Sequence, residues 1–326
     1  MTSLDSAKIK DSCDRIVSQV CDIYVGDRQL VEKVLAAALA NGHVLFEDNP
    51  GLGKTLLAKL LSFSIDCDFS RVQCTPDILP ADILGTKVWR PNDGSFQLFK
   101  GPVFTNVLLL DEINRSPPKT QSAVLEVMEE RQVTIEGETH RCEEPFFVLA
   151  TQNPIEYEGT YPLPEAQIDR FVLKLTTGYP RSLEEEKLIV IRRIAWKKDD
   201  PTRDLKPVIS AAEFKTLQKA AENNVYVDDV VIKYIAEIVR KTRDHQQVEV
   251  GASPRGSLAL LKTSRSMALI KGRDFVTPDD IKMLAVDALA HRIILKVEDV
   301  MRLVDERKVV KQVLDAVEVP KYYHER

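Results

Sequence analysis

Cysteine, histidine and long apolar segments are scarce in this 326-residue sequence. Its five cysteines are odd in number and include no C-x-x-C pair, which argues against a disulfide framework and against a zinc site. We therefore expect free, reduced thiols and a cytoplasmic location. The five histidines are scattered, without the spacing of metal ligands. There is no apolar N-terminal h-region and no apolar run long enough to cross a bilayer, so we expect neither a signal peptide nor membrane insertion.

Charge of either sign is not in large excess. The chain has 45 Lys and Arg residues against 50 Asp and Glu residues, which gives a net charge of −5. A mildly acidic chain is a poor match for nucleic acid or an anionic membrane, so neither is expected as a partner. Hydrophobic content of 44% and charged content of 29% are typical of a globular protein with an ample core, and the length suggests about two domains.

A predicted strand, a glycine-rich loop and a predicted helix follow one another over residues 43–62. The apolar run His43–Phe46 predicts a buried strand, the loop EDNPGLGKT follows, and leucines at helical spacing predict the helix. This order is typical of a phosphate-binding loop, in which glycines let backbone N–H groups approach phosphate oxygens. We expect nucleotide contacts from eight consecutive residues: Asn49, Pro50, Gly51, Leu52, Gly53, Lys54, Thr55 and Leu56.

Two side chains of this loop have specific expected roles. Lys54 can reach the β- and γ-phosphates, and the Thr55 hydroxyl is placed to bind Mg²⁺. The start of the helix adds free N–H groups and the positive end of its dipole. The pattern G-x-x-x-x-G-K-[ST] has glycine where this chain has Asp48. Aspartate tolerates left-handed backbone conformations and forms its own turn hydrogen bonds, so it can replace that glycine.

Two carboxylates follow a second predicted strand. Val107–Leu110 is a continuous apolar run, as expected for a central parallel strand, and Asp111 and Glu112 come directly after it. Ligands of open α/β sheets bind at the carboxyl ends of the strands. We therefore expect Asp111 to hold Mg²⁺ through water, and Glu112 to orient and deprotonate an attacking water molecule.

Two further residues have both a functional and a structural interpretation. Asn153 follows a third predicted strand, Pro145–Thr151, and could hold the attacking water or the γ-phosphate, or form a turn before Pro154. Arg255 is a cation in the first turn of a predicted helix, where the helix dipole favours anions. It could meet an anion such as a γ-phosphate, or it could be an exposed surface arginine.

The remaining patterns divide the chain into an α/β part and a helical part. Helices are predicted over 1–24, 28–40 and 118–130, a short strand over 71–74, and a helix or loop over 75–85. Hairpins are predicted over 86–101 and 131–142, turning at Asp93-Gly94 and Glu136-Gly137. Trp89, Phe96 and Phe99 of the first hairpin either pack together or contact a partner.

Beyond residues 178–180, which we interpret as a hinge, no buried strand is predicted. Helix starts are indicated by Ser182, Ser210, Asp228 or Asp229, Ser253 and Thr277, several of them within capping boxes. The last amphipathic helix is predicted over 298–317.

The assembled pattern resembles the AAA+ ATPases, and within them the MoxR family, over about residues 20–320. The matching stretches are LFEDNPGLGKT, GPVFTNVLLLDEINRSPPKTQSAVLEVMEERQVTI, VLATQNPIEYEGTYPLPEAQIDRF and GASPRGSLALLK. The resemblance implies an α/β nucleotide-binding core over 1–179, with a parallel sheet flanked by helices, followed by a small all-α lid over 180–326. It also identifies the two hairpins with the helix-2 insert (about 84–101) and the pre-sensor-1 hairpin (about 131–143).

The resemblance assigns roles that the residue spacing left open. Asn153 matches the sensor-1 residue. Arg170 matches the arginine finger, which would reach the γ-phosphate of a neighbouring subunit. Arg255 matches the sensor-2 arginine and would act on its own subunit's nucleotide. Arg115, directly after DEIN, could also lie at a subunit interface, but its role stays open.

Family membership further implies ATP and Mg²⁺ as cofactors and hydrolysis of ATP in a homo-oligomeric ring, most commonly a hexamer. Such an ATPase would remodel, assemble or activate client proteins, often ones with von Willebrand factor A domains. Three alternatives stay open at this point. They are the motor subunit of a metal chelatase, a motor acting on nucleic acid, and a nucleotide-dependent scaffold that scarcely hydrolyses ATP.

Overall fold

The structure, a computed structural model, describes residues 6–92, 94–154, 159–197 and 200–323. Its centre is a five-stranded sheet with the strand order β2-β5-β8-β1-β9, and every neighbouring pair is parallel. In chain order the strands are Val44–Glu47 (β1), Phe69–Gln73 (β2), Val107–Asp111 (β5), Phe147–Gln152 (β8) and Leu173–Leu175 (β9). Each predicted core strand is confirmed, with ends that differ from the prediction by one or two residues.

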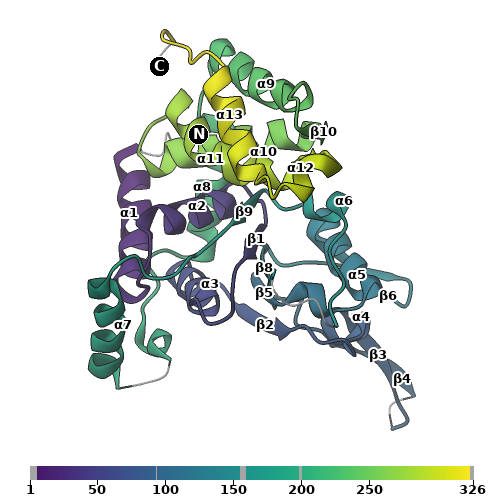
Figure 1. The fold of residues 1–326 in the computed structure, drawn as a ribbon. Coiled ribbons are helices and arrows are strands. Elements are labelled where there is room, and N and C mark those ends of the chain that lie inside the picture. Colours follow the sequence, from purple (N-terminus) through teal and green to yellow (C-terminus); the bar gives the residue numbers. More distant parts are fainter. Residues whose placement is uncertain (1–5, 93, 155–158, 198–199, 324–326) are drawn as a thin grey trace.

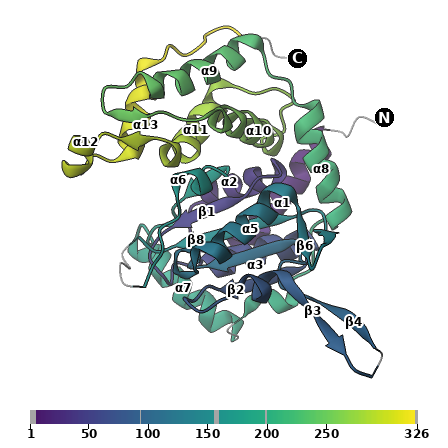
Figure 2. The same cartoon turned by 90° about the vertical axis from the view of Figure 1, so that its right-hand side faces the viewer.

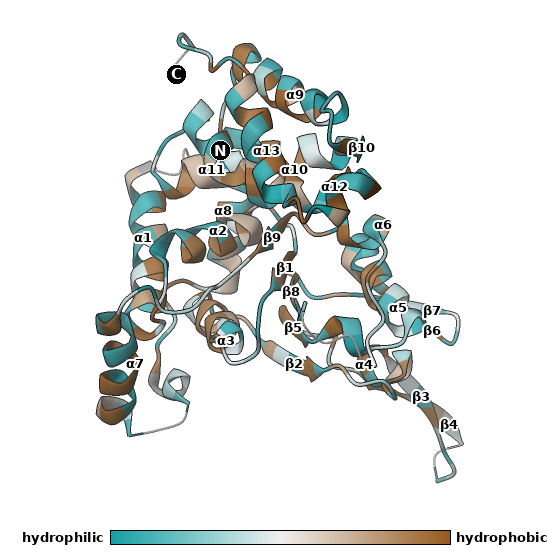
Figure 3. Cartoon of the chain, in the orientation of Figure 1, coloured by the Kyte–Doolittle hydropathy of each residue, from teal (hydrophilic) through white to brown (hydrophobic). Residues whose placement is uncertain are grey.

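Strand β5 lies between two hydrophobic clusters, one on each face of the sheet. Successive side chains of a strand point to opposite faces. Leu109 accordingly belongs to a cluster with α1, α2, α3 and the lid, whereas Leu108 belongs to a cluster with α5 and the hairpins. This double burial explains the uninterrupted apolar run, and Figure 3 shows the central strands as hydrophobic.

Helices cover both faces of this sheet (Figures 1 and 2). In the core they are Ser6–Ile23 (α1), Arg28–Leu39 (α2), Lys54–Ser64 (α3), Pro80–Leu84 (α4), Pro118–Glu130 (α5) and Glu165–Ile168 (α6), with the 3-10 turn Ile113–Arg115 (η1). Helix α5 begins at a proline, which suits the first helical position because its missing N–H would be unpaired there. The predicted helices at 1–24, 28–40 and 118–130 are therefore confirmed within the described residues.

Both predicted hairpins are present as antiparallel pairs outside the main sheet. They are Gly85–Arg90 (β3) with Ser95–Lys100 (β4), and Gln132–Ile135 (β6) with Glu138–Arg141 (β7). The first hairpin projects away from the body of the molecule (Figures 1 and 2), and Asp93 of its turn lies outside the described residues. Trp89 and Phe96 pack edge to face with ring centroids 5.1 Å apart, yet both side chains stay exposed.

The second half of the chain is helical. Its helices are Leu183–Trp196 (α7), Ala211–Asn224 (α8), Asp229–Arg243 (α9), Pro254–Ile270 (α10), Pro278–Leu289 (α11), Val297–Met301 (α12) and Glu306–Ala316 (α13), with the 3-10 turns Pro201–Asp204 (η2) and Ala290–Arg292 (η3). The predicted N-caps are confirmed, since α7, α8, α9, α10 and α11 begin after residues whose side chains accept a backbone N–H: Ser182, Ser210, Asp228, Ser253 and Thr277. No helix of the described chain has the length and apolar character needed to span a bilayer.

The predicted helical lid is confirmed, with one addition and one correction. The addition is a short antiparallel pair, Val248–Val250 (β10) with Ile294–Leu295 (β11), which was not predicted because strands this short carry no periodic signal. The single helix predicted over 298–317 is two helices. Leu303 has a left-handed φ of 56°, which ends the first, and Asp305 caps the second by accepting the N–H of Arg307.

Helices α10 and α11 join the lid to the core, where α10 packs on α1 and α2 and α11 packs beside β9. Helix α7 instead lies beside the N-terminal elements, with Arg192 donating to the backbone carbonyl of Cys21 at 3.1 Å (Figure 1). The domain boundary between residues 179 and 180 stays a prediction.

Candidate functional site

The carboxyl ends of β1, β5 and β8 surround a cavity of about 190 Å³. Nine of the predicted site residues line this cavity. They are the loop residues 50–53 together with Lys54, Thr55, Asp111, Glu112 and Asn153. Of the other expected nucleotide contacts, Leu56 lines a neighbouring pocket and Asn49 donates through Nδ2 to the Tyr179 hydroxyl at 3.1 Å. The structure therefore brings these residues together at one edge of the sheet, and their roles stay predictions.

The glycine-rich loop has the backbone that its glycines permit. Gly51 and Gly53 have φ values of 82° and 79°, a left-handed conformation that side chains other than glycine rarely adopt. Gly53 is the N-cap of α3, so the free N–H groups at the start of that helix belong to residues at the edge of the cavity. Lys54 is buried and donates to the carbonyls of Asp48 and Asn49 at 3.0 and 2.9 Å. Burial lowers the pKa of its ammonium, which nearby carboxylates partly oppose.

Asp111 and Thr55 form an oxygen-rich corner of the cavity. The Thr55 hydroxyl donates to Asp111 Oδ2 at 3.4 Å, and the guanidinium of Arg71 donates to the same oxygen at 2.6 Å. The side chain of Asp111 is about 10% exposed and already faces a cation. A hydroxyl and a carboxylate this close are hard ligands, and Mg²⁺ typically takes one or two such groups while its other ligands are phosphate and water. These residues therefore fit a magnesium ion.

Glu112 is held in position by several groups. Its backbone has a left-handed φ of 56°, an uncommon conformation for glutamate that clusters at functional sites. Its N–H donates to the Thr151 hydroxyl at 2.8 Å. Its carboxylate accepts from Gln73 Nε2 at 2.9 Å and from Arg115 Nη1 at 3.1 Å. The structure thus pairs Arg115 with the site of its own chain, and its implied place at a subunit interface stays a prediction.

The sequence analysis missed two residues of this cavity, Arg71 and Gln73. Both lie on β2, where Gln73 is the direct register partner of Asp111. Both were contained in the predicted strand 71–74, but nothing in the sequence indicated that this strand neighbours β5.

A second, larger pocket of about 420 Å³ adjoins the phosphate loop and shares residues 50–53 with the first cavity. Its other walls come from α7 and from the segments around Tyr24 and Tyr179. Asp48 connects the loop to this wall, because its carboxylate accepts both the N–H and the hydroxyl of Thr177. Its apolar side chains, among them Leu56, Ile189 and Trp196, lie next to the phosphate loop and suit the base of a nucleotide.

Arg170 and Arg255 lie elsewhere, in a third cavity of about 300 Å³ between the core and the lid. Both form ion pairs with Glu129 at the end of α5, and the distance from Arg255 Nη2 to Glu129 Oε1 is 2.6 Å. Burial lowers the pKa of Arg170. Neither arginine lines the phosphate cavity of its own chain. The structure therefore groups Arg255 with Arg170, whereas the resemblance implied that it acts on its own nucleotide.

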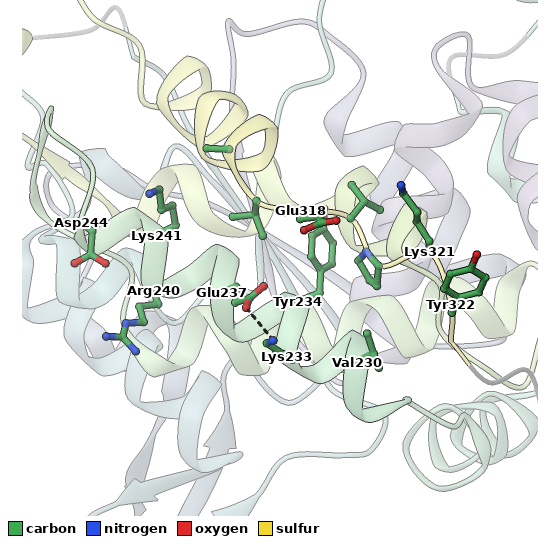
Figure 4. A pocket seen from close by; sticks show the side chains of 14 residues that line it. Val230, Lys233, Tyr234, Glu237, Arg240, Lys241, Asp244, Glu318, Lys321 and Tyr322 are labelled. Atoms are coloured by element: carbon green, nitrogen blue, oxygen red, sulfur yellow. Dashed lines mark ion pairs between the residues drawn. The ribbon is translucent and has the colours of Figure 1, made fainter.

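A further groove, of about 770 Å³, is on the lid, between α9 and the segment after α13 (Figure 4). Its charged residues are of both signs, and Lys233 pairs with Glu237 at 3.6 Å. It contains none of the predicted site residues.

A parallel α/β core with a glycine-rich loop, an oxygen-rich corner at Thr55 and Asp111 and a positioned glutamate, followed by a helical lid, is the architecture of the AAA class of ATPases. Comparison with known proteins agrees. Residues 43–173 match the ATPase family associated with various cellular activities (AAA), and residues 240–313 match the AAA lid domain.

Individual relatives extend over almost the whole chain. The chain is 47% identical to YeaC of Bacillus subtilis over 94% of each chain. It is 42% identical to Chaperone MoxR1 of Mycobacterium tuberculosis, over 94% of this chain and 82% of that protein. A solved structure from Cytophaga hutchinsonii, described as a candidate ATPase, superposes with a TM-score of 0.89 at 38% identity over 97% of each chain. The chain therefore belongs to the MoxR family of AAA ATPases.

Proposed function

We propose that this protein hydrolyses Mg²⁺-bound ATP and uses the energy to remodel, assemble or activate client proteins. The observation that carries the ATPase proposal is the convergence of Lys54, Thr55, Asp111 and Glu112 on one cavity. The chaperone part of the proposal is supported by the similarity to Chaperone MoxR1. The free thiols of its five cysteines fit work in the reducing cytoplasm.

Each residue of the site has its own role in this proposal. The Lys54 ammonium would give up its hydrogen bonds to two loop carbonyls and donate to phosphate oxygens instead, and Thr55 and Asp111 would hold the magnesium ion. Bound Mg²⁺ would supply the positive charge that neutralises the phosphate oxygens. Glu112 directly follows β5 and lines the same cavity, where its carboxylate can accept a proton from the attacking water. Asn153 lines the same cavity and would orient that water or the γ-phosphate.

The site is incomplete within one chain. Arg170 is a suitable arginine finger, but it faces the core–lid cavity and not its own phosphate loop. A second copy could bring its Arg170 to this chain's ATP, so we propose a homo-oligomeric ring, with six members as the family expectation. Client proteins with von Willebrand factor A domains are part of the same proposal. We prefer it to a chelatase motor because the chain resembles Chaperone MoxR1 and a MoxR protein over 94% and 95% of its length.

A mixing experiment tests this function. Arg170→Ala should bind ATP but lose hydrolysis by about 10³-fold or more, the scale associated with arginine fingers. Glu112→Gln should also be inactive alone. Mixed, some interfaces combine an intact Glu112 with an intact Arg170 from the neighbour, so part of the phosphate release should return.

The exposed Arg240 provides a matched control, because Arg240→Ala should keep wild-type turnover. Fluorescence transfer between labelled subunits verifies that subunits exchange. If exchange occurs and activity does not return, or if an isolated monomer hydrolyses ATP at the full rate, the trans arrangement is wrong.

A further inference from the structure

A buried arginine of the lid, Arg292, donates hydrogen bonds to the residues directly before and after Arg170. Arg292 ends the 3-10 turn η3, and its side chain is 2% exposed. Its Nε donates to the carboxylate of Asp169 at 2.8 Å, and its Nη2 donates to the carbonyls of Asp169 and Phe171 at 3.0 and 2.7 Å. The residues directly before and after Arg170 are therefore both fixed to one lid side chain.

Helix α10 of the lid adds a second contact to the same carboxylate. The hydroxyl of Ser253, the N-cap of α10, donates to Asp169 Oδ2 at 2.9 Å. In the first turn of this helix Arg255 pairs with Glu129, and Glu129 also pairs with the guanidinium of Arg170. The lid thus contacts Arg170 through its neighbouring backbone and through its ion-pair partner.

These contacts are costly to break. Burial lowers the pKa of Arg292 to about 10, while Asp169 acts in the opposite direction, so the guanidinium stays protonated at neutral pH. A buried charge that loses its carboxylate partner is strongly destabilised, so the lid and the segment 169–172 are expected to move together. Helix α6, which leads into this segment, also packs against η3 beneath the lid helices (Figure 2).

We propose that Arg292, acting through Asp169, is a positioning residue that couples the position of Arg170 to the lid. A lid that moves when its own chain binds or releases nucleotide would then advance or withdraw the finger offered to the neighbouring chain. This inference rests on the proposed function, because it assumes that Arg170 completes a neighbour's site.

The variants Arg292→Lys and Asp169→Asn test the coupling. Both leave the phosphate cavity intact, so the dissociation constant for ATP and the KM should stay within about threefold of wild type. The kcat should fall about 10- to 100-fold, the scale expected when a reacting group is misplaced by about 1 Å. Lys33→Met is the matched control. It removes another core–lid ion pair, Lys33 Nζ to Asp287 Oδ2 at 2.6 Å, which does not touch residues 169–172.

Mixing separates positioning from general structural damage. If Arg292 acts through Arg170, each variant should regain phosphate release when mixed with Glu112→Gln, whose finger is intact. Neither should regain it when mixed with Arg170→Ala, because no interface then has a competent finger. Asp169→Asn, an isosteric change, keeps the test available if Arg292→Lys does not fold.

Two results would overturn the inference. One is an unchanged kcat in Asp169→Asn. The other is failure of Asp169→Asn to recover with Glu112→Gln under conditions in which Arg170→Ala does recover with it. If Arg170→Ala and Glu112→Gln themselves do not complement each other, it is the proposed trans function that has failed.

Discussion

The side-chain amide of Gln73 donates a hydrogen bond to the carboxylate of Glu112 across 2.9 Å. The orientation of this amide is itself fixed, because Gln73 Oε1 accepts from Arg71 Nη2 at 3.0 Å. Arg71 in turn pairs with Asp111, so the two carboxylates of the site are connected through β2. The predicted base and the predicted magnesium ligand therefore share one hydrogen-bonded network.

Glu112→Gln should bind ATP with near wild-type affinity but hydrolyse it at least about 10²-fold more slowly, the usual scale for losing a general base. The amide keeps the shape of the side chain and can still accept from Gln73, but it cannot take a proton. Single-turnover phosphate release measures the effect. Glu130→Gln, at an exposed carboxylate on α5, should change nothing. Turnover of Glu112→Gln near the wild-type rate would show that another group is the base.

Lys54→Ala should weaken ATP binding by at least about 100-fold, because charge-assisted contacts to two phosphates are lost at about 1.5–3 kcal/mol each. Calorimetric titration measures the affinity. Lys59→Ala is the matched control, since Lys59 lies on the same helix but pairs with Asp200 at 2.9 Å, outside the phosphate cavity. Near-normal affinity of Lys54→Ala would contradict the assignment of the phosphate loop.

The sequence predicted the part of the site that lies at strand ends. Asp111 and Asn153 follow strands whose apolar runs are long enough to recognise, and parallel strands bring their carboxyl ends together. Arg71 and Gln73 could not be found in this way. Their place beside Asp111 depends on the strand order, which a single sequence does not contain.

The packing of the lid on the core could not be predicted from the sequence either. Helical periodicity shows which face of a helix is buried, but it does not show what covers that face. The shared ion pair of Arg170 and Arg255 with Glu129 depends on how α10 packs on the core, and this packing joins residues about 126 positions apart. The pairing of β10 with β11 was missed for a different reason, since two or three residues carry no periodic signal.

Asp48→Gly should lower the free energy of unfolding by at least about 3 kcal/mol, although it restores the glycine of the general loop pattern. In this chain the Asp48 carboxylate accepts two hydrogen bonds from Thr177, and bonds to a charged group are worth about 1.5–3 kcal/mol each. Urea unfolding measures the change. Asp48→Asn keeps an acceptor oxygen and should lose less. Equal stability of wild type and Asp48→Gly would mean that the contact with Thr177 contributes nothing.

Buried His43 should make the protein less stable in mild acid. Its Nδ1 accepts the N–H of Val148 at 3.0 Å and its Nε2 lies 3.0 Å from the carbonyl of Met128, so both nitrogens of the neutral ring are hydrogen-bonded. Burial lowers the pKa of this imidazole to about 3, with the charge of Arg131 acting in the same direction. The unfolded chain, with an ordinary pKa of 6.5, binds a proton at pH values where the folded chain does not.

Stability should therefore be complete above about pH 6.5 and decline as the pH falls towards 3. As the pH falls from 7 to 5, His43 alone should lower the free energy of unfolding by about 2 kcal/mol. Burial lowers the pKa of His291 as well, so it adds a loss in the same direction. His43→Gln supplies one donor and one acceptor without titrating, so the free energy of unfolding of this variant should depend less steeply on pH across this window. Urea titrations at pH 7, 6 and 5 measure both slopes, and identical slopes for wild type and variant would show that His43 is not the titrating group.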